Sequence, residues 1–402
     1  MALSVEEARV RVLDGVEPLP AEVIAVGTAH GRVLTADLAA LRSQPAEAVS
    51  AMDGYAVRAA DVTNLPAALT VIGEAAAGQP FVGTIGHGET ARIFTGGVLP
   101  AGADAVVLQE HSDRRGAVVV IKSSPPVGKH VRAPALDFAR GAVVLRKGRR
   151  LSDRDLALAA GMNHPVVAVH RRPKLGILAT GDELVAPGSE LARGQVVYSN
   201  GFAIAALARR EGAEVADFGI VPDRLDPTVT AIEQVRRSGV DILVTTGGAS
   251  VGDYDLVKRS LEIQGLKLAF WKVAMRPGRP LIHGRIGATH VLGLPGNPVS
   301  SYVGAFLFLI PLLRRLCGRS DLFAPLESAV LGRDLAKNDE RTDYLRAQLD
   351  VGADGTLVAT PFGLQDSSLL VPLAQADCLV VRDPYAAAAK SGTRCGVIKL
   401  DL

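Results

Sequence analysis

The sequence predicts a multidomain protein of α/β plus β class, built around a doubly wound and mainly parallel α/β domain. Residues 175–179 and 242–244 are continuous apolar runs, which are typical of strands covered on both faces. Segments with the helical spacing of apolar residues separate such runs, and strands that alternate with helices favour a parallel sheet. The length of 402 residues exceeds the size at which a single core keeps growing, so two to four domains are expected.

The elements from residue 174 to residue 317 are expected in the order strand, helix, strand, helix, strand, helix, strand, strand, helix. Asn200 is expected to cap the first helix, which runs to about Glu211, and a strand follows at residues 215–221. A helix at about 227–237 leads into the second apolar run, and a strand at 291–294 precedes the last helix.

The flanking regions differ from this pattern. Between residues 69 and 144, short β-rich runs are separated by clusters of Gly, Pro and Asp, and after Gly318 short strands again alternate with turns. We therefore expect four parts, which are an α/β domain at 1–20 and 169–320, a helical and extended linker domain at 21–49 and 141–168, a small inserted β domain at 50–140, and a C-terminal β-barrel-like domain at 321–402.

Composition narrows the classes of function. A net charge of +2 gives no long-range field that would recruit nucleic acid or a membrane surface. The three scattered cysteines include no CxxC pair, so a reducing cytoplasm is expected rather than a disulfide framework or a cysteine zinc site. The first ten residues lack a signal-peptide core, and Ser4 with Glu7 predicts a capping box. The longest apolar run, residues 302–313, contains Pro311 and is too short to span a bilayer, so a soluble protein is expected.

The segment DILVTTGGASVGDYD, residues 241–255, combines a buried strand, a glycine-rich loop and two carboxylates. Gly247, Gly248 and Gly252 leave backbone N–H groups uncovered, and a helix that begins near Asp253 would add its positive N-terminus. Asp253 and Asp255 are suited to hold a divalent metal beside a bound phosphate. The alternative is that the loop is only a tight connection between strand and helix.

Other strand ends carry polar loops as well. Asp182 and Glu183 follow the strand at 175–179, and Asp223 follows the strand at 215–221. Because ligands bind at the carboxyl edge of an open α/β sheet, we expect these loops to share one site. An acidic pair in such a place is otherwise a helix N-cap. A further loop follows the strand at 291–294, and two prolines hold its free amides in place, Pro295 and Pro298.

Two segments of the first region stand out chemically. Asp53 precedes Gly54 in the turn of SAMDGYAV, and Thr95 opens the Gly- and Pro-rich loop TGGVLPAGAD. The Thr95 hydroxyl and the free amides of that loop are suited to contact an oxyanion. By spacing alone both segments are simply turns, since Asp-Gly is a common turn dipeptide.

These segments together resemble one family, molybdopterin molybdenumtransferase, which is related to the molybdenum-inserting domains of Cnx and gephyrin. The resemblance covers nearly the whole chain. It rests on seven blocks in order, which are SAMDGYAV at 50–57, TGGVLPAGADAVV at 95–107, ATGDEL at 179–184, GIVPD at 219–223, TGGASVGDYD at 246–255, RPGRP at 276–280 and LPGNPVSS at 294–301.

The resemblance implies a function and an assembly. Such an enzyme takes molybdopterin-AMP and molybdate as substrates with Mg²⁺, releases AMP and forms molybdenum cofactor. The adenylyltransferase that makes the substrate is the upstream donor, and molybdoenzymes or their chaperones are the acceptors. An elongated homodimer is implied, in which the small β domain of one subunit completes the cleft of the molybdopterin-binding α/β domain of its partner.

The resemblance also implies roles for individual residues. Metal and phosphate binding falls to Glu183, Asp223 and Asp253 with Asp182 adjacent, while Asp53 and Thr95 reach across the dimer. The expected substrate-binding residues are Gly247, Gly248, Ser250, Gly252, Arg276, Arg279, Pro295, Pro298, Ser300, Arg346 and Ser367. For Ser300, Arg346 and Ser367 the alternative is a solvated surface.

The chain departs from the family pattern in several places. Arg276 and Arg279 stand where lysines are usual, and a guanidinium fork is not equivalent to an ammonium. Tyr198 takes the place of an acid or amide, the C-terminal serine loop reads QDSSLLVPL at 365–373, and PAEAV from Pro45 lacks the usual Phe and Asn. A paralogue with altered donor, acceptor or efficiency is therefore an open reading.

Two other functions remain open. One is the molybdopterin adenylyltransferase, which shares the α/β domain but normally lacks the extra domains. The other is a non-catalytic scaffold that binds molybdopterin proteins, against which the clustered acids argue because a scaffold has no need of their mutual repulsion.

Overall fold

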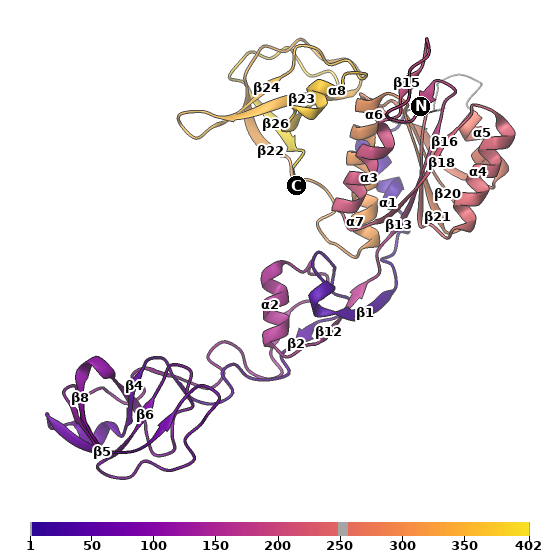
Figure 1. Ribbon diagram of the computed structural model, residues 1–402. Coiled ribbons are helices and arrows are strands. Elements are labelled where there is room, and N and C mark those ends of the chain that lie inside the picture. Colours follow the sequence, from indigo (N-terminus) through magenta and orange to yellow (C-terminus); the bar gives the residue numbers. More distant parts are fainter. Residues whose placement is uncertain (1, 248–255, 402) are drawn as a thin grey trace. The chain divides into compact units, whose positions relative to one another are not determined.

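The computed structural model describes residues 2–247 and 256–401, and the chain separates into two compact units (Figure 1). The larger unit comprises Met1–Glu22, Gly31–Val33 and Val169–Leu402, and the smaller comprises Val23–His30 and Leu34–Ala168. The predicted fold class, α/β plus β in several parts, is confirmed by the sheets described below.

A six-stranded sheet forms the centre of the larger unit, in the order β16-β13-β17-β21-β20-β18. β13 pairs in parallel with β16 and β17, and β17 with β21, whereas β20 and β18 are antiparallel. The sheet is therefore mainly parallel, as predicted. Its strands are β13 (Lys174–Thr180), β16 (Glu214–Val221), β17 (Ile242–Thr246), β18 (Lys267–Lys272), β20 (Pro280–Ile286) and β21 (Thr289–Leu294).

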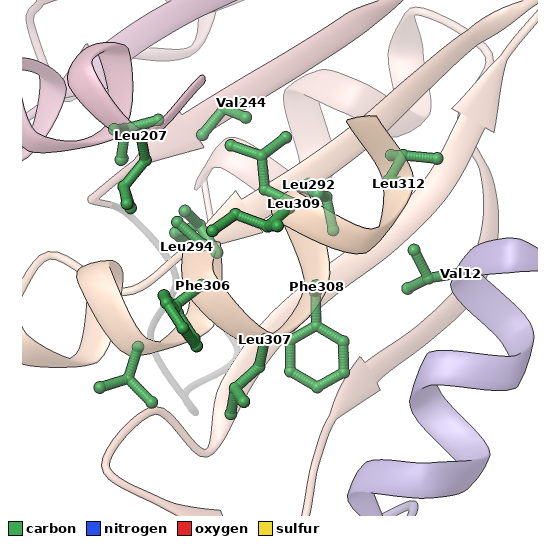
Figure 2. Close-up of a cluster of buried hydrophobic side chains, with 14 of the residues drawn as sticks. Val12, Leu207, Val244, Leu292, Leu294, Phe306, Leu307, Phe308, Leu309 and Leu312 are labelled. Carbon is green, nitrogen blue, oxygen red and sulfur yellow. The ribbon is translucent and has the colours of Figure 1, made fainter. Parts of the chain in front are cut away.

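Helices cover both faces of this sheet, so it is doubly wound. Because strand side chains alternate, Ile177 and Val244 point to one apolar core while Leu178 and Leu243 point to the other. Figure 2 shows side chains of the first core, among them Val244 and Leu292 of the sheet and Phe306 and Leu309 of the helical stretch. The first face carries α1 (Val5–Leu13), α3 (Asn200–Arg210) and α6 (Pro298–Gly304), and the second carries α4 (Leu225–Arg237) and α5 (Leu256–Ile263).

The last predicted helix is present as one helical stretch that ends at Leu316. α6 continues through a π-helical turn, η4 (Ala305–Leu309), into α7 (Ile310–Leu316), because Pro311 lies in the first turn of α7, where it interrupts least. By length and mean hydropathy of 1.4, Pro298–Leu316 resembles a membrane span, but 89% of it is buried within the fold. This is typical of the core helix of a globular domain.

Local details partly match the sequence predictions. The capping box of Ser4 and Glu7 is confirmed. Asn200 as a helix cap is wrong, because the cap position is Ser199 and the Asn200 amide instead donates to the Gly296 carbonyl at 2.7 Å. The predicted order has two strands before the last helix, whereas the structure has three longer ones there, β18, β20 and β21. The short strands β14 (Leu184–Val185), β15 (Val196–Val197) and β19 (Met275–Arg276) were not predicted either.

The C-terminal part is a closed barrel of five strands. The order β23-β24-β22-β26-β25 closes because β23 also pairs with β25, and β19 joins β23 in parallel at the side. The barrel interior holds Ala347, Ala359 and Val380. Its elements are β22 (Glu327–Leu331), β23 (Thr342–Val351), β24 (Leu357–Pro361), β25 (Cys378–Arg382), β26 (Arg394–Lys399) and the short helix α8 (Leu370–Ala374).

The smaller unit contains a six-stranded sheet in the order β7-β4-β6-β5-β9-β8 and two short strand pairs, β3–β10 and β2–β11. Tyr55, Val57 and Ile121 lie in its core. β1 (Ala21–Ala25) and β12 (Val166–His170) pair with each other and contain residues of both units. The other elements are β2 (Leu38–Ala39), β3 (Val49–Ser50), β4 (Gly54–Val57), β5 (Ala67–Ala75), β6 (Glu89–Ile93), β7 (Ala105–Leu108), β8 (Ser112–Arg115), β9 (Val118–Ile121), β10 (Val131–Arg132), β11 (Val143–Leu145) and α2 (Asp153–Gly161).

Candidate active site

Four parallel strands end at the same edge of the central sheet. The paired residues Thr180 and Val221 are the last of β13 and β16, and Thr246 pairs with Leu294 at the ends of β17 and β21. The loops that follow these strands are the ones the sequence predicts to share a site. Parallel pairing in this register therefore gathers them, as expected for an open α/β sheet.

Three carboxylates lie in two of these loops. The Asp223 backbone N–H donates to Asp182 Oδ1 at 3.1 Å, and the Glu183 carboxylate folds back over Gly181, where any Cβ would lie 2.6 Å from it. Partial burial raises the pKa of Asp223, and the neighbouring charges of Glu183 and Asp182 raise it further. The cluster is therefore short of positive charge.

The expected metal ligands are only partly described. Within residues 2–247 and 256–401, no three His, Cys, Asp or Glu side chains stand in an arrangement that would hold a metal ion. Asp253, the fourth predicted ligand, lies outside the described residues, as do Gly248, Ser250 and Gly252. The carboxylates that are described supply oxygen donors, which suit Mg²⁺.

A pocket of about 500 Å³ opens at this edge, a size typical of sites for small organic molecules. Gly247 lies in its wall with φ +88°, and a Cβ there would be 2.2 Å from the Thr180 carbonyl, so only glycine fits. Polar and apolar side chains both line the pocket. Its lining is Thr180, Glu183, Leu184, Val196, Val197, Tyr198, Ser199, Asn200, Thr246, Gly247, Gly296, Asn297, Pro298, Ser368 and Leu370.

The proline-flanked loop after β21 connects the pocket to the C-terminal serine loop. The Asn297 amide donates to Ser367 Oγ at 2.9 Å, and the Val299 N–H donates to the Ser367 carbonyl at 3.0 Å. Pro298, which lines the pocket, is the first residue of α6, where its missing N–H costs no hydrogen bond. Sequence reasoning placed Pro295 and Ser367 near the site but missed Asn297, whose side chain makes the link.

The predicted oxyanion residues are not a solvated surface. Ser300 and Arg346 are 5% and 1% exposed, and Ser367 is partly buried. Arg346 Nε donates to Gln365 Oε1 at 3.2 Å and Nη1 to the Leu369 carbonyl, while Nη2 is buried without a hydrogen-bond partner in the described chain. A buried cation with an unused donor is an unusual arrangement that an anion would satisfy.

The two arginines of RPGRP lie in different surroundings. Arg276 forms two hydrogen bonds with the Asp343 carboxylate and one of 3.2 Å with Asp339. Hydrogen bonds to Asp343 raise the pKa of Arg276 further above its ordinary value. Arg279 is exposed, and its side chain has no hydrogen-bond or ion-pair partner among the described residues. Of these two arginines, Arg279 is therefore the one whose guanidinium is not already paired within the described residues.

The smaller unit places Asp53 and Thr95 together. Asp53 Oδ1 accepts from the Thr95 backbone N–H at 2.7 Å and from the Thr95 hydroxyl at 2.9 Å. These hydrogen bonds, and to a lesser degree the charge of Arg92, lower the pKa of Asp53. No group in the described chain hydrogen-bonds to Oδ2, so this carboxylate oxygen is not used by the turn itself.

Tyr198 forms part of the pocket wall. The ring centroids of Tyr198 and Phe202 are 5.9 Å apart. A Cβ added to Gly201 would lie only 1.7 Å from the Tyr198 hydroxyl oxygen, so the hydroxyl fills the space beside this glycine. Burial, followed by the Asp217 charge, raises the pKa of Tyr198. The departure from the family pattern therefore puts a neutral aromatic side chain at the pocket.

The apolar wall was not foreseen. Leu184, Val196 and Val197 come from the two-residue strands β14 and β15, which pair in parallel. Strands this short carry no detectable period of two, so no signal in the sequence distinguishes them from the surrounding loop.

Three family models match consecutive parts of the chain. They are the MoeA N-terminal region (domain I and II) at residues 3–162, a probable molybdopterin binding domain at 176–315, and the MoeA C-terminal region (domain IV) at 328–400.

Similar proteins agree over nearly the full length. The molybdopterin molybdenumtransferase of a Nostoc species is 38% identical over 371 residues, covering 90% of this chain and 84% of that protein, and the one of Haemophilus influenzae is 32% identical, covering 94% of each. Two solved molybdopterin biosynthesis MoeA proteins of Pyrococcus horikoshii superpose with TM-scores of 0.86 and 0.83 at 29% and 25% identity, covering 99% of this chain and 99% and 100% of those. The chain thus belongs to the molybdopterin molybdenumtransferase family.

Proposed function

We propose that this protein inserts molybdenum from molybdate into adenylylated molybdopterin, releasing AMP and forming molybdenum cofactor. The observation that carries the proposal is the pocket at the carboxyl edge of the sheet, where Asp182, Glu183 and Asp223 adjoin a glycine-bounded wall. The names of the relatives give the same reaction class. A substrate with a flat ring system and a phosphoanhydride fits a pocket that is lined by both apolar and polar side chains.

The acids support a magnesium site, which we propose is formed by Glu183, Asp223 and Asp253 with Asp182 adjacent. Burial and then the charges of Glu183 and Asp182 raise the pKa of Asp223, and a cation there would favour its ionised form. Bound Mg²⁺ would supply charge neutralisation at the phosphoanhydride. The chain's own part is to hold carboxylate oxygens at two neighbouring strand ends.

For the molybdate end we propose Arg279, with the buried Arg346 and the serines of the two linked loops, Ser300 and Ser367. The unused Nη2 donor of Arg346 supports this assignment. We propose that Arg276 holds the loop in place through its ion pairs rather than binding the oxyanion itself.

We further propose a homodimer in which Asp53 and Thr95 complete the partner's cleft. Apolar side chains gathered near the pocket support a subunit contact, because Val196, Val197 and Phe202 are 51%, 41% and 59% exposed. The four-part division of the chain, a cytoplasmic location, an adenylyltransferase as donor and molybdoenzymes or their chaperones as acceptors complete the proposal.

One assay tests the reaction. Purified protein is incubated with adenylylated molybdopterin, molybdate and Mg²⁺, and both AMP and active cofactor are measured, with Asp223→Asn as the matched control. Release of AMP together with cofactor, lost in the control, is the expected result. Adenylylation of free molybdopterin from ATP would instead identify the adenylyltransferase, and binding without turnover would identify a scaffold.

A further inference from the structure

Arg92 lies next to the Asp53 turn and packs against two aromatic rings. It is on β6, directly opposite Tyr55 of β4 in the antiparallel pair. The guanidinium carbon lies 5.2 Å from the ring centroid of Tyr55 and 4.8 Å from that of Phe94. Such cation–π contacts fix the plane and position of the guanidinium without using its N–H donors.

The N–H donors of Arg92 act on the backbone around Asp53. Nη1 donates to the Gly54 carbonyl at 3.1 Å, and Nη2 donates to the side-chain oxygen of Gln109. The Gln109 backbone N–H in turn donates to the Asp53 carbonyl at 3.2 Å. The Arg92 guanidinium therefore connects Gly54, the residue after Asp53, to Gln109, whose backbone N–H donates to the Asp53 carbonyl.

The turn has little freedom to compensate for the loss of Arg92. A Cβ at Gly54 would stand 1.9 Å from the Val107 carbonyl oxygen, so the backbone passes as close to β7 as it can. Arg92 forms no ion pair with a carboxylate among the described residues, since its partners there are two carbonyl-type oxygens and two rings. Arg92 therefore does not stabilise the fold through a salt bridge with a described carboxylate.

We propose that Arg92 is the positioning residue for Asp53, fixing the turn so that the free Oδ2 faces the ligand at a set place. This inference rests on the proposed function of Asp53 in the cleft. A lysine would keep the charge over the rings, but it has no planar fork that reaches the Gly54 carbonyl and Gln109 together.

The test is a double-mutant cycle measured by single-turnover AMP release at saturating molybdate and Mg²⁺. The variants are Arg92→Met, which keeps the apolar contact with the rings, Arg92→Lys, Asp53→Asn, and each Arg92 change combined with Asp53→Asn. Arg115→Met, an exposed arginine in β8 of the same sheet, is the control. Thermal unfolding of every variant separates a loss of activity from a loss of folding.

We expect Arg92→Met to slow AMP release roughly tenfold, while the KM for adenylylated molybdopterin changes by less than about twofold. Arg92→Lys should release AMP faster than Arg92→Met but more slowly than the native protein. In the Asp53→Asn background the same Arg92 change should cost less than about twofold, because its effect passes through Asp53. An equal loss in both backgrounds, or a rise in KM alone, would overturn the inference. Near-native activity of Asp53→Asn would instead overturn the proposed role of Asp53. The Asp53 variant therefore tests the proposed function, and the Arg92 variants test the positioning role.

Discussion

The backbone N–H of Asp223 donates to Asp182 Oδ1 at 3.1 Å, which joins the exit loop of β16 to that of β13. Because the two strands pair in parallel with Thr180 opposite Val221, this contact brings two acidic loops together at one edge of the sheet. Partial burial raises the pKa of Asp223, and the charges of the nearby Glu183 and Asp182 carboxylates raise it further. An arrangement that costs stability in this way is typical of a functional site.

Asp223→Asn should therefore stabilise the fold while it abolishes activity. The folded protein raises the Asp223 pKa above its usual value of 3.8, so folded chains bind this proton more tightly than unfolded ones and stability falls as pH rises through the raised value. At pH 7 without metal, Asn should raise Tm by on the order of 1 °C, with the gain vanishing below about pH 4.

The same variant should lose AMP release by roughly a hundredfold or more, as expected for the loss of a metal ligand. Calorimetry with and without Mg²⁺ checks the ligand role, since Mg²⁺ should raise the Tm of the native protein more than that of the variant. Glu190→Gln, which changes an exposed acid in the nearby 186–195 loop, is the control. Equal Mg²⁺ stabilisation in all three proteins would remove Asp223 from the metal site.

Mixing two inactive subunits should restore activity. If Asp53 acts in the partner's cleft, a heterodimer of Asp53→Ala and Glu183→Ala subunits carries one intact site, because both lesions fall in the other. We expect up to about half of the native activity per heterodimer, measured on mixed dimers verified by mass. Inactive verified heterodimers would contradict the shared cleft.

The proposed subunit contact makes a separate prediction. Phe202 in α3 is 59% exposed beside the pocket wall, and a charge there would oppose burial against a second copy. Phe202→Glu should weaken dimerisation at least tenfold, or about 1.4 kcal/mol, by sedimentation. Ile263→Glu, on α5 at the opposite face of the sheet and 55% exposed, should leave the dimer intact. An unchanged dimer in the Phe202 variant would place the contact elsewhere.

The strands and the shared edge were predictable because burial on both faces leaves a continuous apolar run in the sequence. Ile242, Leu243 and Val244 read directly as a strand, and the parallel order fixed which loops meet. The π-helical turn η4 before Pro311 was not predicted, because no local pattern in the sequence indicates such a turn.

Side-chain contacts between segments that are far apart in the chain could not be predicted from the sequence. Arg276 was predicted to bind an oxyanion by its place in RPGRP, but the pairing of β19 with β23 puts Asp343, 67 residues later, against its guanidinium. Arg92 escaped notice for the same reason, since its aromatic neighbours and its acceptors come from three different strands and loops. Such contacts follow from strand register, which a single sequence does not specify.

The two arginines of RPGRP should now respond differently to substitution. Arg279 is exposed and unengaged in the described chain, so Arg279→Ala should raise the molybdate concentration for half-maximal insertion at least tenfold, about 1.4 kcal/mol, with little change in Tm. Arg279→Lys should lose less, because charge is kept while the bidentate fork is lost.

Arg276→Ala should act mainly on stability. It leaves the Asp343 carboxylate, only 5% exposed, without the guanidinium that pairs with it, which costs about 1–3 kcal/mol for a buried group left unsatisfied. Arg276→Ala combined with Asp343→Asn should recover part of that loss, since the buried charge is then gone. Molybdate titrations and denaturant unfolding of all four variants separate the roles. If Arg276→Ala shifts the molybdate midpoint as far as Arg279→Ala does while stability is unchanged, both arginines bind the oxyanion and the ion pairs give way to substrate.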